Sequence, residues 1–146
     1  MNVLIREKSC GAVIYHKKED QTKYLLLNYA AGHWDFVKGN VELGETEKET
    51  VVRELKEETG ITDAAFIDGF KETIAYFYRR QGLTVHKEVV FFIMESHTEK
   101  VVLSFEHVGY IWLDYKAAME KLNFKNAKDV LQKAHDFLKK RGTVKD

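Results

Sequence analysis

Proline is missing from all 146 residues of the chain, although it averages about 5% of protein sequences. The turns must therefore use glycine, asparagine and aspartate, which tolerate the backbone angles of tight turns. The single cysteine, Cys10, excludes an intrachain disulfide. We expect Cys10 to be a small buried hydrophobic residue, and such sparse use of cysteine fits a reducing compartment.

Long apolar runs are also missing, because no segment approaches the roughly 18 residues that a membrane span needs. Residues 1–9 carry charge too early for a secretory signal, so we predict a cytoplasmic protein with no membrane partner. Net charge is zero, since Lys plus Arg and Asp plus Glu both number 23. This balance argues against a general nucleic-acid coat, and an anionic ligand would need a locally basic pocket.

The residues that are present fit one folded domain. Hydrophobic residues make up 45% of the chain and charged residues 32%, which is typical of a globular protein and not of a disordered one. We find no repeat, linker or low-complexity segment. Residues 1–146 are therefore predicted to form a single domain.

Runs of apolar and β-branched residues predict several strands. The expected strands span residues 3–5, 10–16, 24–29, 66–80, 85–96 and 109–112. The polar segment 17–23 is expected to be a hairpin loop.

Helical periodicity begins at Glu45, and Gly60 is placed to end that helix. Asp114 is predicted to cap a short helix and Asn126 to cap the last one, whereas residues 139–146 are expected to fray. The last helix carries one apolar stripe, which should face the core. That stripe consists of Ala127, Val130, Leu131, Ala134 and Leu138. These elements predict an α/β fold with a mixed sheet between helical layers.

Three glutamates on the first helix carry the strongest chemical signal. Glu54, Glu57 and Glu58 are related by i, i+3 and i+4 spacing, so they project from one face and repel one another. A divalent cation would remove that repulsion, and magnesium prefers such oxygen ligands. Glu45 could add a ligand or cap the helix, and Arg53 could hold Glu57. The alternative for the three glutamates alone is a solvated charged face.

The wider segment favours the metal site. Five residues separate Gly39 from Glu45, and seven more separate Glu45 from Arg53. The run that starts at Arg53 is Arg-Glu-Leu-Lys-Glu-Glu-Thr-Gly-Ile. This pattern resembles the Nudix box of the Nudix hydrolases at every fixed position. Those positions are Gly39, Glu45, Arg53, Glu54, Leu55, Glu57, Glu58, Gly60 and Ile61.

The resemblance implies an α/β/α sandwich with a mixed sheet, and an enzyme that hydrolyses nucleoside diphosphates linked to another group. Glu54, Glu57 and Glu58 would bind magnesium, or alternatively manganese, and the Gly39 carbonyl could join them. Either Glu54 or Glu58 would serve as the general base, and Arg53 would complete the catalytic set. Metal bound to phosphate oxygens would neutralise charge and help to deprotonate water.

A narrower resemblance covers most of the chain. The run His-Trp-Asp-Phe-Val-Lys-Gly at 33–39, together with segments 69–76, 104–107 and 110–113 and Lys87, looks like the asymmetrical diadenosine tetraphosphate hydrolases. It implies several further contacts outside the box. His33, Lys38 and Lys87 would contact phosphate, Tyr76 would stack on adenine, and Glu106 would be a further metal ligand or base.

Simpler alternatives remain for these residues. Lys87 could be an edge-strand charge that discourages aggregation, and Tyr76 could be a core aromatic. One departure concerns the loop before Lys38, where Phe36 and Val37 stand in place of the prolines that are usual in the family. The five histidines other than His33 show no metal-ligand spacing and are expected to be structural. They are His16, His86, His97, His107 and His135.

The predicted reaction is the asymmetrical hydrolysis of diadenosine tetraphosphate to ATP and AMP. The first alternative is another Nudix activity, such as removal of pyrophosphate from an RNA 5′ end or cleansing of the nucleotide pool. RNA would favour a longer basic track than this neutral chain offers. The second alternative is a non-catalytic nucleotide sensor, which could dispense with the metal-binding glutamates. The sequence leaves the oligomeric state open.

Overall fold

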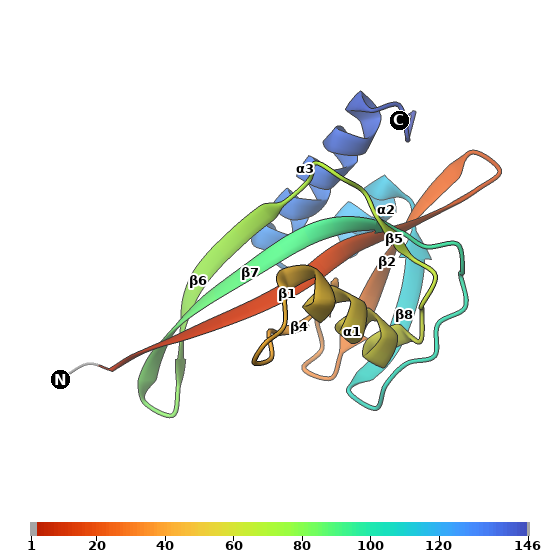
Figure 1. The fold of residues 1–146 in the computed structure, drawn as a ribbon. Helices are drawn as coiled ribbons and strands as arrows, with labels where there is room; N and C mark the ends of the chain where they lie inside the picture. The colour runs from red at the N-terminus through yellow and green to blue at the C-terminus, as the bar shows by residue number, and fades with distance from the viewer. Residues whose placement is uncertain (1–2, 146) are drawn as a thin grey trace.

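A long first strand, β1 (Leu4–Lys18), organises the sheet of the computed structural model, which describes residues 3–145 (Figure 1). β1 runs parallel to β7 (Leu83–Glu95), from the pair Leu4↔Thr84 to Tyr15↔Glu95. Its far end forms an antiparallel hairpin with β2 (Gln21–Tyr29). These pairings place β1 at the centre of a mixed sheet.

The predicted strands 3–5 and 10–16 are one strand in the structure. The polar residues 6–9 that separate them continue the ladder, because they pair with β7 over 86–89. Their exposure alternates along the strand, as expected where one face is solvated. The hairpin loop is correspondingly shorter than predicted, since the turn occupies only Glu19 and Asp20.

The predicted strand 66–80 is two strands. β5 (Ala65–Phe66) pairs with the end of β7, and β6 (Glu72–Arg80) forms the expected hairpin with the rest of it. Between them the chain turns at Gly69, whose φ of 97° suits only glycine well. β3 (Trp34–Asp35) and β8 (His107–Leu113) pair with β2, and β4 (Val37–Asn40) pairs with β1.

Three helices within residues 3–145 cover the two faces of the sheet. α1 (Glu47–Thr59) begins at a capping box between Thr46 and Glu49, and it ends at Gly60, whose left-handed backbone confirms the predicted stop. α2 (Tyr115–Lys121) is capped by Asp114, as predicted.

The prediction for the start of the last helix is wrong. α3 (Lys125–Lys140) begins before Asn126, at the N-cap residue Phe124, whose ring cannot accept a main-chain hydrogen bond. The expectation of a frayed end also fails up to residue 145. The helix reaches Lys140, and Val144 is buried because main-chain bonds to Leu138 fold the chain back. Residue 146 lies outside the described residues.

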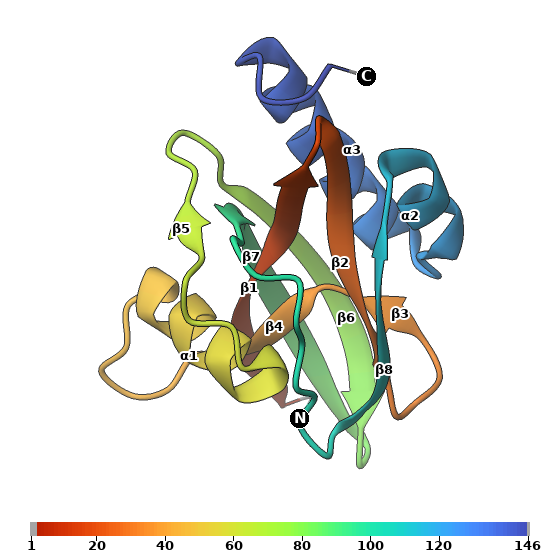
Figure 2. The ribbon, with the colours of Figure 1, turned by 90° about the vertical axis from the view of Figure 1, so that its right-hand side faces the viewer.

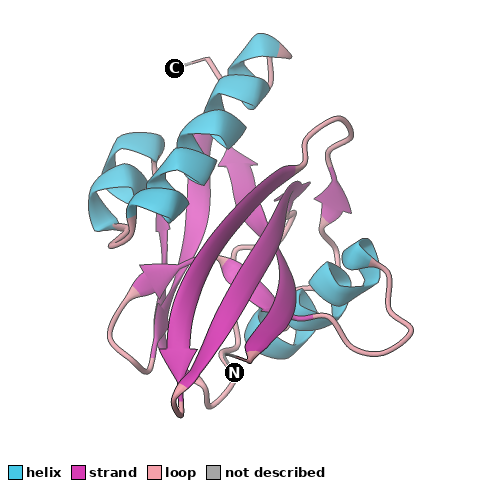
Figure 3. Ribbon diagram, turned by 90° about the vertical axis from the view of Figure 1, so that its left-hand side faces the viewer, coloured by secondary structure: helices cyan, strands magenta, loops and turns pink. Residues whose placement is uncertain are grey.

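The two faces of the sheet carry separate hydrophobic cores. α2 and α3 cover one face, and α1 covers the other (Figures 2 and 3). The predicted stripe of α3 lies in the first core, and Cys10 is buried in the second. Burial raises the pKa of the Cys10 thiol to about 11, so it is an inert packing residue. The predicted α/β/α sandwich is confirmed.

Among the helices of residues 3–145, none is long and apolar enough to cross a membrane.

Candidate active site

Two apolar residues fix helix α1 against one face of the sheet and so set the direction of its glutamates. Val51 and Leu55 are buried against the sheet. Glu54 and Glu58 flank this buried line, and their side chains are only 15% and 4% exposed. Glu57 lies farther round the helix, and its side chain is 57% exposed. The structure therefore buries Glu58, partly buries Glu54 and leaves Glu57 at the surface.

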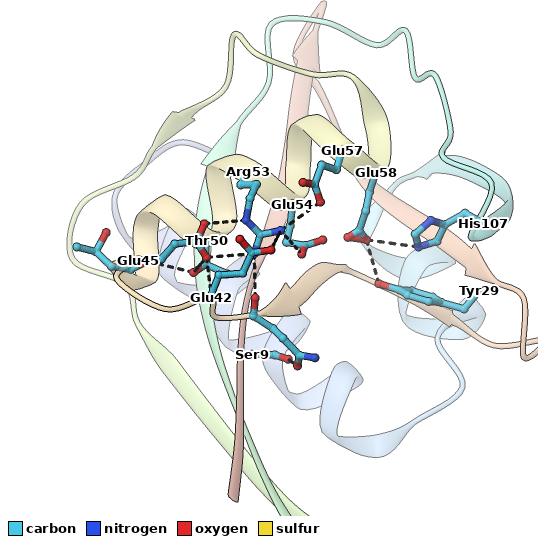
Figure 4. A network of polar contacts seen from close by, with 12 residues as sticks. Ser9, Tyr29, Glu42, Glu45, Thr50, Arg53, Glu54, Glu57, Glu58 and His107 are labelled. Atoms are coloured by element: carbon cyan, nitrogen blue, oxygen red, sulfur yellow. Dashed lines mark hydrogen bonds and ion pairs between the residues drawn. The ribbon is translucent and has the colours of Figure 1, made fainter.

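Arg53 connects these carboxylates (Figure 4). Its Nη1 donates to Glu54 Oε1 at 2.7 Å and to Glu57 Oε2 at 3.1 Å. Its Nε donates to Glu45 Oε2 at 2.7 Å, and its Nη2 donates to the Asn40 carbonyl at 2.9 Å. The predicted contact between Arg53 and Glu57 is confirmed, and the same guanidinium also ties the helix to β4.

Glu45 supports Arg53 and the start of the helix. Besides the guanidinium, it accepts hydrogen bonds from the Thr50 hydroxyl at 2.8 Å and from the Glu42 main-chain N–H at 2.9 Å. The hydrogen bond from Arg53 lowers the pKa of Glu45 to about 2. Glu45 is thus ionised in this structure, and its carboxylate holds Arg53, Thr50 and the main chain of Glu42 in place. Thr46 occupies the cap position that the sequence had offered to Glu45.

Gly39 brings the backbone of β4 against the carboxyl group of Glu54. A Cβ atom at this position would overlap the Glu54 side chain. Gly39 pairs with Cys10 of β1, so the strand cannot move away without losing its ladder. Only glycine therefore allows this close approach. The predicted role of its carbonyl as a metal ligand stays a prediction.

Glu58 is a buried carboxyl group beside a second one. Its Oε2 has no hydrogen-bond partner within the described part of the chain, while the Lys38 main-chain N–H donates to the carboxyl group. Burial raises the pKa of Glu58 well above its usual range, and the nearby Glu54 carboxylate raises it further. Burial likewise raises the pKa of Glu54, against the influence of Arg53. A proton shared by this pair is one way to relieve the repulsion, and a divalent cation is another.

The donor set fits a hard divalent cation, although the side chains are not closed around one point. Over residues 3–145, no three His, Cys, Asp or Glu side chains are arranged to enclose an ion. The Arg53 guanidinium instead balances Glu54 and Glu57. Oxygen donors at Gly39, Glu54 and Glu58 nevertheless suit magnesium, which keeps several waters and needs few protein ligands.

Two residues that the sequence did not assign to the site enclose Glu58 (Figure 4). The Tyr29 hydroxyl donates to the Phe36 carbonyl at 2.6 Å and lies 3.5 Å from Glu58 Oε1. His107 Nε2 lies 3.4 Å from the same oxygen, and the two rings are 4.5 Å apart. Burial lowers the pKa of His107, which favours the neutral imidazole. No local spacing links these residues to Glu58, since only sheet pairing places them together.

Glu106 lies beside this group on the turn before β8. Its side chain belongs to an exposed residue, and its negative charge adds to the rise in the pKa of Glu58. Its main-chain N–H faces the Ser104 hydroxyl at 3.4 Å. Its predicted role as a metal ligand or base stays a prediction.

A cavity of about 480 Å³ lies on the α3 face of the sheet, and it meets the glutamate site only through β4, because Lys38 lines the cavity and the next residue, Gly39, lies against Glu54. It brings together three of the predicted substrate-binding residues, His33, Lys38 and Tyr76. Its walls also include Phe124 and Asp35, neither of which the sequence singled out. Asp35 holds the Lys38 ammonium at 2.9 Å, and Phe124 lies against the His33 ring at 5.2 Å. A second hollow, of about 450 Å³, lies between the β1–β2 turn and the C-terminal segment, away from this chemistry.

Lys87 lies outside the residues that line the cavity. It pairs with Tyr76 across the β6–β7 hairpin, and its Nζ donates to Asn40 Oδ1 at 2.8 Å. Burial lowers the pKa of Lys87. Because β7 lies between β1 and β6, Lys87 is not on an edge strand, which removes the alternative role of an edge charge. Its predicted phosphate contact stays a prediction.

Comparisons with known proteins identify the family of the chain. Residues 6–134 match the NUDIX domain family. The asymmetrical bis(5′-nucleosyl)-tetraphosphatase of Mus musculus is 34% identical, with 90% of this chain and 95% of that protein covered. Its counterpart from Caenorhabditis elegans is 32% identical, with 90% and 96% covered.

Among solved structures, a binary complex of the C. elegans Ap4A hydrolase superposes with a TM-score of 0.80. It is 31% identical, with 90% of this chain and 97% of that chain covered. The sandwich fold, the intact box and these matches agree, and the chain belongs to the Nudix family of hydrolases.

Proposed function

We propose that this Nudix hydrolase cleaves diadenosine tetraphosphate asymmetrically, to ATP and AMP, with magnesium or alternatively manganese. The observation that carries the proposal is that an aromatic cavity meets the glutamate site at β4, where Lys38 lines the cavity and the next residue, Gly39, lies against Glu54. Tyr76 and Phe124 both line the cavity, and Lys38 connects it to Glu58 through its main-chain N–H. The tetraphosphatases among the relatives point to the same substrate.

The cavity suits one adenosine and the phosphates next to it. An aromatic face stacks on a base with about 1–3 kcal/mol, and Tyr76 offers such a face at the cavity wall. Lys38 and His33 offer donors to phosphate at the same wall. Lys87 extends the positive charge along the sheet, held by Asn40.

The glutamates then carry the hydrolytic step. A bound divalent cation would supply charge neutralisation on the phosphate oxygens and a more acidic water. Gly39, Glu54, Glu57 and Glu58 would hold it, with Glu57 exchanging its contact with Arg53 for the cation, and Glu106 would approach from the turn before β8.

Of the two candidates for the general base, we favour Glu58. Its Oε2 is free of hydrogen-bond partners among residues 3–145. Tyr29 and His107 enclose the same carboxyl group. Water would add to the phosphorus next to one adenosine, its proton would pass to the carboxylate, and the bridging P–O bond would break to release ATP.

The test is hydrolysis of diadenosine tetraphosphate with magnesium in oxygen-18 water, followed by mass spectrometry. We expect equal amounts of ATP and AMP, with the heavy oxygen in AMP. Two molecules of ADP would contradict the asymmetrical cut. No turnover would leave the alternatives of another Nudix substrate or a nucleotide sensor. The organisation of residues 1–146 as one domain and a cytoplasmic location remain part of the proposal.

A further inference from the structure

A tight turn at residues 104–107 is fastened to the C-terminal end of α1. The His107 main-chain N–H donates to the Ser104 carbonyl at 3.2 Å, which closes the turn around Phe105 and Glu106. The Ser104 main-chain N–H donates to the Glu58 carbonyl at 3.4 Å. Together with the 3.4 Å approach of His107 to the Glu58 carboxyl group, these contacts attach the turn directly to the glutamate site.

Phe105 presents its ring to solvent at the tip of this turn. The residue is 96% exposed, and Val102 and Val108 on either side of it are 63% and 67% exposed. Because the ring is in contact with water, it does not contribute the favourable free energy that a buried aromatic side chain gives to folding. Singly exposed apolar residues are common, but this ring lies on a loop attached to the glutamate site, and binding residues concentrate on such loops.

The turn and the aromatic cavity lie on different sides of the phosphate site. The cavity is lined from the face of the sheet that α3 covers. The turn is joined by a main-chain hydrogen bond to α1, and α1 covers the opposite face of the sheet (Figure 2). Lys38 lines the cavity, and its main-chain N–H donates to the Glu58 carboxyl group. The main-chain carbonyl of Glu58 accepts from the Ser104 N–H. A substrate that starts in the cavity and passes the glutamates therefore leaves the site beside Phe105.

We propose that Phe105 is a stacking surface for the second base of a dinucleoside polyphosphate. This inference rests on the proposed function. It adds to that function an explanation of why the enzyme would prefer a substrate with a nucleoside at each end. Base stacking on an aromatic ring is tolerant of base identity. The second base is thus held without a pocket, which suits an exposed turn.

The test compares two substrates that differ only at the far end. Diadenosine tetraphosphate carries the second adenosine, and adenosine 5′-tetraphosphate lacks it. We expect Phe105→Ala to raise KM for the dinucleotide at least about five-fold, the range of one base stacked on an aromatic ring. Its kcat for the dinucleotide and both constants for the mononucleotide should stay unchanged, because the glutamates and the cavity are untouched. Phe105→Tyr, which keeps the flat face, should retain the original KM.

Phe77→Ala is the matched control, since Phe77 is also an exposed aromatic, at 66% exposure, but lies on β6 against His86. It should leave both substrates unaffected. Equal changes on the two substrates in Phe105→Ala, or no change on either, would overturn the role of Phe105 while leaving the proposed function intact. Failure of the unaltered protein to cleave the dinucleotide would overturn both.

Discussion

Replacing Glu58 by glutamine should stabilise the metal-free protein while destroying its activity. The residue is 3% exposed, and its Oε2 has no hydrogen-bond partner among the described residues. Its carboxyl group also lies beside that of Glu54. Glutamine has nearly the same shape and no charge, so Glu58→Gln removes the cost of a buried carboxylate without opening a cavity.

The sign of the pH dependence follows from the raised pKa of Glu58. Below the ordinary pKa of about 4.5, the carboxyl group is protonated in both the folded and the unfolded chain. As the pH rises toward the higher folded pKa, the folded protein keeps a proton that the unfolded chain has lost. The free energy of unfolding then falls by about 1.4 kcal/mol per pH unit for this one proton.

Between pH 6 and pH 8 the unaltered protein should lose about 2–3 kcal/mol relative to Glu58→Gln. For a chain of this length, the difference in Tm between Glu58→Gln and the unaltered protein should therefore widen by about 5–10 °C over this pH range. The assay is thermal unfolding in EDTA across this pH range. Added magnesium should reverse the loss in the unaltered protein, because a bound cation replaces the proton.

Glu57→Gln is the matched control, because its side chain is 57% exposed and paired with Arg53 at the surface. Its Tm should change little and with little pH dependence. In magnesium, Glu58→Gln should lower kcat at least about 100-fold, the smallest contribution expected of a general base. A Tm difference between Glu58→Gln and the unaltered protein that stays constant from pH 6 to pH 8 would refute the reasoning.

Three further substitutions test other parts of the site. Gly39→Ala should lower kcat, because its Cβ would displace the Glu54 carboxyl group from its present position. Full activity would mean that this position of the Glu54 carboxyl group is not needed for turnover. Arg53→Lys keeps the positive charge, but lysine cannot hydrogen-bond Glu45 and Glu54 at the same time as the guanidinium does. The kcat should therefore fall at least about ten-fold. Unchanged kinetics would contradict the role of Arg53 in connecting the carboxylates. Tyr76→Ala should raise KM for diadenosine tetraphosphate about 5- to 100-fold while Tyr76→Phe stays near normal; an equal loss in both variants would point to the hydroxyl instead of the stacked ring.

Features with local causes were predictable from the sequence. The i, i+3 and i+4 spacing put the three glutamates on one helix, and the left-handed preference of Gly60 ended that helix where expected. The wrong boundaries also have physical reasons. The strand 4–18 continues through the polar residues 6–9 because β7 pairs with all four of them, and β4 joins on the other side from Ser9 onward. The break between β5 and β6 follows from a turn at Gly69 that apolar periodicity does not reveal.

The sequence by itself determined the loop–helix segment and its carboxylates, since neighbours along one helix decide both. Only the tertiary structure decided that Glu58 is buried while Glu57 stays exposed, because burial depends on which side of α1 packs against the sheet. It also decided that Tyr29 and His107 enclose Glu58. These residues come from strands far apart in the chain, and only the pairing of β2 with β8 makes them neighbours.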